Sequence, residues 1–121
     1  MRKVLILLLV STSALAQETP RTASDQLVAC SVTYAKQHPS PRLTATELSE
    51  AAVTACSSAA DKVRDLAYRD GLAAAQKLSA EQRNVLGEEL QRTVRRGADQ
   101  IRADAIQRAK GEVLRSLAES K

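Results

Sequence analysis

The amino-acid sequence predicts an all-α protein of about three helices: a disulfide-stapled helical hairpin followed by a long amphipathic helix. From residue 45 to residue 121 the chain contains no proline, and strong helix formers such as Ala, Leu, Arg, Glu, Gln and Lys dominate it. Apolar residues recur there every three or four positions. Two capping-box patterns mark the places where helices are expected to begin.

Residues 1–16 have the pattern of a cleaved secretory signal peptide. Arg2 and Lys3 supply a positive start, residues 4–10 are apolar, and Ala14 and Ala16 place small side chains before a cut at Gln17. A membrane-spanning helix needs about 20 apolar residues, which this segment does not reach. The pattern predicts export to the periplasm or the extracellular space, with no transmembrane span after cleavage. Residues 17–121 then form a single small helical domain.

The composition of the predicted mature chain limits the classes of function. The formal charge of +4 includes Arg2 and Lys3, so about +2 remains after cleavage, and acidic and basic residues are interleaved. The chain has no Phe, no Trp and two Tyr, so it offers little for stacking on bases, and nucleic-acid binding is not expected. A core rich in alanine is thin, which favours a covalent staple, a partner or self-association.

A first helix is predicted to begin at Thr22 or Ser24, with Asp25 in its first turn, and to run to about Gln37. Pro39 ends it. Residues that share one face of this helix are Leu27, Cys30 and Tyr34.

A second helix is predicted to begin at Thr44, which forms a capping box with Glu47. Its apolar face is expected to hold Leu48, Ala52, Ala55, Ala59 and Val63.

The predicted hairpin brings Cys30 and Cys56 to similar heights, because they lie at comparable distances before and after the turn. An even pair of cysteines in an oxidising compartment indicates a disulfide. A redox or metal-binding pair is the alternative, but the chain has no C-x-x-C motif and His38 is its only histidine. The pattern therefore favours a structural disulfide between Cys30 and Cys56, with no metal and no cofactor.

A single helix through residues 45–121 would exceed about 100 Å, so a break is expected near Gly71 or Ser79. Ser79 is favoured because it forms a second capping box with Gln82. The third helix then runs from Ala80 to about Ala118. Its apolar stripe comprises Leu86, Leu90, Val94, Ala98, Ile101, Ala105, Ala109, Val113 and Leu117.

This stripe is expected to pack within the molecule; coiled-coil dimerisation and binding along a membrane surface are the alternatives. The spacing also predicts ion pairs on the polar face, between Glu88 and Arg92 and between Asp104 and Arg108.

The sequence points to no catalytic site. His38 has no nucleophile or orienting carboxylate in a recognisable pattern, and the adjacent Glu88 and Glu89 face different sides of a helix. Phosphate-binding, zinc-protease and calcium-loop motifs are also missing from the sequence. A basic cluster of Arg92, Arg95 and Arg96 is either a solvated helix face or an interaction patch for an acidic partner or lipid headgroups.

Residues 78–83, Leu-Ser-Ala-Glu-Gln-Arg, followed by Leu86, resemble the L-T-x-x-Q motif of the small periplasmic stress chaperones related to Spy and CpxP. The resemblance implies an all-helical exported protein that holds unfolded clients. Ser79 stands where the motif has Thr, a second copy of the motif is missing, and Cys30 and Cys56 are not part of the family pattern.

These observations predict an exported cell-envelope protein with a binding or structural role and no enzymatic activity. Its partner is expected to be a protein or a second copy of the chain. A chaperone of the Spy and CpxP kind and a binder of anionic envelope surfaces are the alternative functions.

Overall fold

The computed structural model describes residues 18–120, which form four helices and no strand. These are α2 (Pro20–Gln37), α3 (Ala45–Ala55), α4 (Ser57–Ala75) and α5 (Ala80–Glu119). The predicted helical class is confirmed. The helix count is four because the predicted second helix is divided into α3 and α4.

Helix α2 begins earlier than its sequence pattern suggested. Thr19 is the N-cap: its hydroxyl accepts from the amide of Thr22, and the Thr22 hydroxyl accepts from the amide of Thr19. Pro20 occupies the first helical position, where its missing N–H costs no helical hydrogen bond. Thr22 therefore completes a capping box and does not start the helix. The predicted end at Gln37 is confirmed.

Helix α3 begins at the predicted capping box of Thr44 and Glu47, but the helical path is interrupted at Cys56. The backbone of Cys56 has φ −101° and ψ 25°, outside the helical range. Helix α4 restarts from this residue, whose carbonyl accepts from the amides of Ala59 and Ala60 at 3.0 and 3.3 Å.

The interruption at Cys56 shifts which side chains of the following helix face the core. Ala55 is exposed and Ala59 is half-buried, although a continuous helix would have placed both on the apolar face. The buried side chains of α4 are Ala60, Val63, Leu66 and Ala67.

The turn between α4 and α5 lies at the predicted place. Helix α4 ends at Ala75, and Ser79 is the N-cap of α5, in a capping box with Gln82. Gly71 stays inside α4, so it does not break the helix.

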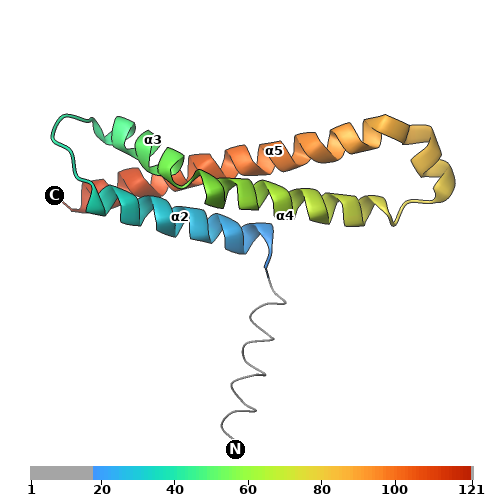
Figure 1. Cartoon of the computed structure of the whole chain (residues 1–121), viewed down its shortest axis with the longest axis horizontal. Coiled ribbons are helices and arrows are strands. Elements are labelled where there is room, and N and C mark those ends of the chain that lie inside the picture. The colour runs from blue at the N-terminus through green and yellow to red at the C-terminus, as the bar shows by residue number, and fades with distance from the viewer. Residues whose placement is uncertain (1–17, 121) are drawn as a thin grey trace, which may run out of the picture.

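Helix α5 contains a kink that the periodicity did not predict. Gly87 has φ 49° and ψ −129°, a conformation that a residue with a β carbon rarely adopts. Figure 1 shows the first turns of α5, in gold, lying across the end of the α4–α5 hairpin before the rest of the helix runs back along α4.

The helices form an antiparallel bundle in which α2 and α5 run one way and the line of α3 and α4 runs the other (Figure 1). The core face of α2 is a row of residues four apart: Ala23, Leu27, Ser31 and Ala35. Residues that α5 contributes to the core are Ala98, Ala105, Ala109 and Val113. Alanine predominates, as the composition predicted, so the helices approach closely but bury few large side chains.

Ion pairs between helices hold the polar edges of the bundle. Arg102 of α5 pairs with Asp61 of α4 at 3.2 Å, and Arg108 of α5 pairs with Asp25 of α2 at 2.8 Å. Asp25 therefore lies opposite α5 and not in the first turn of α2, and the expected pairing of Arg108 with Asp104 is wrong.

Among the described helices, none combines the length and the apolar character that crossing a membrane requires.

Candidate functional site

Helices α4 and α5 extend well beyond the start of α2, so one end of the molecule is a two-helix hairpin (Figure 1). We call this part, residues 70–97, the arm. Between residues 80 and 97 every side chain is exposed except those of Leu90 and Val94, which are half-buried. The arm therefore carries the first part of the predicted α5 stripe without the third helix that covers the stripe elsewhere.

The end of the arm has an open apolar groove of about 350 Å³. Leu78, Val85 and Leu86 supply its apolar lining, and Glu81 and Gln82 lie at its polar margin. Val85 is 80% exposed and Leu86 is 43% exposed. The local sequence builds this groove because the Ser79 cap starts α5 directly after Leu78.

The glycine at position 87 completes the groove. Its non-helical backbone ends the first helical segment of α5 directly after Val85 and Leu86. The neighbouring apolar side chains are thus presented on a short segment that is turned away from the axis of α5.

The predicted basic cluster has carboxylates beside two of its three members. Arg92 pairs with Glu88 at 3.7 Å, as predicted, and with Glu89 at 3.2 Å. Arg95 lines an open cleft of about 280 Å³ between α4 and α5, and Arg96 is exposed. The other residues of this cleft are Arg64, Asp65, Tyr68, Ala98 and Asp99. The surface around Arg92 and Arg95 therefore carries both signs of charge.

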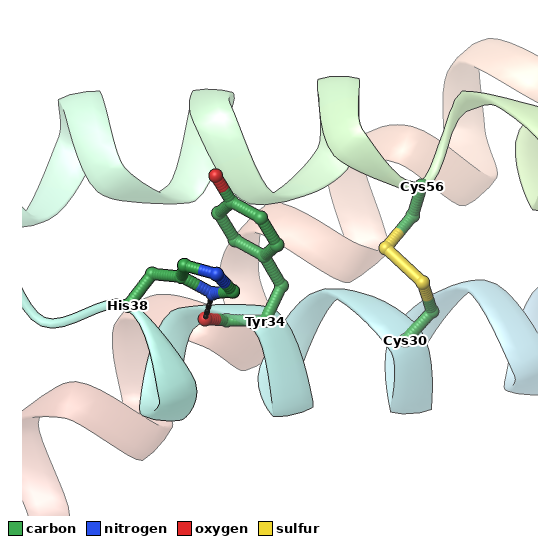
Figure 2. The surroundings of a disulfide bond; sticks show 4 residues. All are labelled: Cys30, Tyr34, His38 and Cys56. Carbon is green, nitrogen blue, oxygen red and sulfur yellow. Dashed lines mark hydrogen bonds between the residues drawn. A yellow bond between two sulfur atoms is a disulfide. The ribbon is translucent and has the colours of Figure 1, made fainter.

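The predicted disulfide is confirmed: Cys30 of α2 is bonded to Cys56, and their Cα atoms are 6.1 Å apart. The two cysteines differ in exposure, because Cys30 is exposed whereas Cys56 is only 4% exposed. A groove of about 370 Å³ lies along the disulfide, and Tyr34 contributes to its wall. Figure 2 shows Cys30, Tyr34 and His38 on successive turns at the end of α2.

His38 ends α2, as the sequence suggested. Its Nδ1 lies 3.0 Å from the carbonyl oxygen of Tyr34, which can only accept, so the contact is a hydrogen bond in the tautomer that carries the proton on Nδ1 (Figure 2). The imidazole also stacks on the Tyr34 ring, with 4.2 Å between ring centroids and 18° between planes. Both contacts fix the end of the helix.

The predicted cut between Ala16 and Gln17 lies outside the described residues. Within residues 18–120, His, Cys, Asp and Glu side chains form no group of three or more that could hold a metal ion.

The exposed end of the arm is the feature that the sequence reasoning missed. The predicted stripe included Leu86 but not Val85. Adjacent residues of a helix point to different sides, so Val85 and Leu86 cannot both face one narrow seam. The pair was therefore a signal for an apolar side chain outside the core.

Comparison of the chain with protein-family models, with curated proteins and with solved structures finds no match in any of the three.

Proposed function

We propose that the protein is an exported, non-catalytic binding protein of the cell envelope, and that the end of its arm binds an apolar segment of another polypeptide. The periplasm or the extracellular space is the proposed location. The Cys30–Cys56 disulfide supports it, because such bonds persist in oxidising compartments. The signal-like residues 1–16 support the same location.

The observation that carries this proposal is the exposure of Val85 beside Leu86 in the groove. The Val85 side chain is 80% exposed. A partner that covers it removes apolar surface from water, which stabilises the complex by about 25 cal/mol per Å² of apolar area buried. The groove volume of about 350 Å³ is at the lower end of the range of binding pockets, which suits a few side chains of a peptide segment.

The charges of the arm favour a polypeptide over a highly charged polymer or surface. Residues 70–97 carry five Lys or Arg and four Asp or Glu, a balance of +1. Such a mixed surface gives little attraction to nucleic acid or to an anionic bilayer. An apolar segment of a protein needs no net charge on its receptor.

The resemblance of residues 78–83 to the chaperone motif supports a client-holding form of this binding. In this chain the motif places Ser79 at the start of α5 and Leu86 in the groove. An unfolded client would present the apolar segments that the groove accepts.

The test measures light scattering while a model enzyme aggregates on heating, with and without the mature, oxidised protein. We expect the wild type to delay aggregation, and Val85→Asp and Leu86→Asp to lose most of this effect. Leu43→Asp is the matched control, because Leu43 is 40% exposed, close to the 43% of Leu86, but lies in the loop before α3. Equal delay by all four proteins, or no delay by the wild type, would contradict the proposal.

Two further measurements separate other occupants of the arm. A dimer in light-scattering mass analysis that Val85→Asp dissociates would identify a second copy as the occupant, and would contradict a client. Binding to anionic phospholipid vesicles that survives Val85→Asp but is lost in an Arg92→Glu, Arg95→Glu, Arg96→Glu variant would assign the protein to envelope surfaces instead.

A further inference from the structure

The disulfide joins two residues that differ in their exposure to solvent. Cys30 is on the exposed side of α2, whereas Cys56 belongs to the larger core cluster with Leu27, Val53 and Ala60. In Figure 2 the bond runs from α2 up to the junction of α3 and α4. A reagent in solution therefore has readier access to Cys30 than to Cys56.

The groove along the disulfide offers a path for an incoming thiol. Its volume is about 370 Å³, and its walls come from α2 and from the end of α3. The residues that line it are Ala29, Cys30, Thr33, Tyr34, Gln37, Ala55 and Cys56. This lining contains no charged side chain, so nothing in it repels a thiolate.

The helix dipoles do not determine which of the two sulfur atoms an incoming thiolate attacks. Cys56 is at the start of α4, where the free amides favour negative charge. It is also at the end of α3, whose last carbonyls disfavour negative charge. Because the two effects oppose each other at one residue, access decides which sulfur is attacked.

We propose that Cys30 is the site at which an external dithiol exchanges with this disulfide, and that Cys56 is the sulfur that leaves. A thiolate of the dithiol attacks Sγ of Cys30 and forms a mixed disulfide there. The Cys30–Cys56 bond breaks, and its electron pair leaves on Sγ of Cys56, which takes up a proton from solvent.

The second thiol of the dithiol completes the exchange. As a thiolate, it attacks its partner sulfur in the mixed disulfide and forms a cyclic disulfide. The Cys30 sulfur leaves as a thiolate and is protonated, so two electrons pass from the dithiol to the protein. In the reverse direction, an oxidised partner forms the mixed disulfide on Cys30, and the thiolate of Cys56 then closes the native bond.

The rest of the structure allows this exchange without unfolding α2. The start of α2 is held by the ion pair of Arg108 with Asp25 and by the contact of Lys62 with Glu18. Leu27 is fully buried and anchors the same part of the helix. These contacts do not depend on the disulfide, so they remain available to the first half of α2 when reduction opens the link between α2 and the α3–α4 junction. This inference does not depend on the proposed function.

The test treats the oxidised wild-type protein with excess glutathione, followed by rapid acid quenching, alkylation of free thiols and tryptic digestion. Cleavage separates residues 22–36, which contain Cys30, from residues 43–62, which contain Cys56. We expect early glutathione adducts on Cys30 to exceed those on Cys56 by about tenfold or more. Equal adducts on both cysteines, or a preference for Cys56, would overturn the proposal.

A second measurement uses single-cysteine variants in native buffer and in denaturant. In Cys56→Ser, the thiol of Cys30 should react with an aromatic disulfide reagent at nearly its unfolded-state rate. In Cys30→Ser, the buried thiol of Cys56 should react about tenfold or more slowly in the folded protein. If circular dichroism shows that either variant is unfolded, the adduct ratio of the oxidised wild-type protein decides whether the proposal stands.

Discussion

Gly71 of α4 lies directly against Val94 of α5: a β carbon on Gly71 would be 2.7 Å from Cγ1 of Val94. Real β carbons do not come that close to another carbon atom, so the missing side chain is what lets the two helices meet within the arm. The contact also explains why Val94 is half-buried although most of its neighbours on α5 are exposed.

Gly71→Ala is therefore expected to destabilise the protein, although alanine is the better helix former. The added methyl forces the arm helices apart or strains Val94, which costs about 1–3 kcal/mol. Urea denaturation followed by circular dichroism measures the loss.

Gly97→Ala and Gly111→Ala are matched controls for the Gly71 variant, since a β carbon at either position meets nothing within 4 Å. Both should stabilise the protein by up to about 1 kcal/mol through helix propensity. In a Val94→Ala background the penalty of Gly71→Ala should shrink. A stabilising Gly71→Ala would show that the contact does not exist.

Two buried serines should respond differently to alanine. Ser31 on α2 is fully buried, and its hydroxyl has no hydrogen-bond partner among the described residues. The hydroxyl of Ser49, which is also buried, donates to the carbonyl of Thr46 at 2.7 Å. Ser31→Ala should stabilise the protein by about 1 kcal/mol, since an unsatisfied buried hydroxyl is costly. Ser49→Ala should give no gain. Equal changes in the unfolding free energy of the two variants would refute this difference.

Loss of the disulfide should cost more than any single ion pair. The bond closes a loop with a sequence separation of 26, which the chain-entropy model values at about 3–4 kcal/mol. A Cys30→Ser, Cys56→Ser double variant should unfold at correspondingly lower denaturant. Reductant should bring the wild type to the same midpoint and leave the double variant unchanged. Full reduction by intact mass without a shift of the wild-type midpoint would contradict the prediction.

Any substitution of Gly87 should be unfavourable in the present backbone conformation. Its φ of 49° with ψ −129° lies outside the left-handed helical region that Asn can enter. Gly87→Ala and Gly87→Asn should therefore be about equally unfavourable, by about 1–3 kcal/mol. A β carbon there meets nothing within 4 Å, so the cost is one of backbone and not of crowding. An Asn variant as stable as the wild type would disprove this account.

Features that depend on a few neighbouring residues could be predicted from the sequence. The capping boxes at Thr44 and Ser79 need only two side chains and two backbone amides, in residues that are three positions apart. The prediction of the Cys30–Cys56 pairing required only the positions of two helices on either side of a short turn. These rules act within one helix or one hairpin, so no knowledge of the whole bundle was required.

Features that depend on how the helices lie against one another could not be predicted in this way. The break at Cys56 lies where no proline or glycine marks it. The exposure of Val85 follows from where α2 begins relative to α4 and α5, and from the kink at Gly87. Helical periodicity identifies an apolar stripe, but it does not say which part of the stripe another helix covers.

The position of the disulfide has a consequence for the order in which the chain can assemble. Both cysteines lie within the first half of the sequence, whereas α5 supplies Ala105, Ala109 and Val113 to the two core clusters from the end of the chain. For a chain threaded N-terminus first into an oxidising compartment, the α2–α3 hairpin can be covalently closed before α5 has emerged. In a chain delivered in this way, the last helix would dock onto a hairpin whose register the disulfide has already locked.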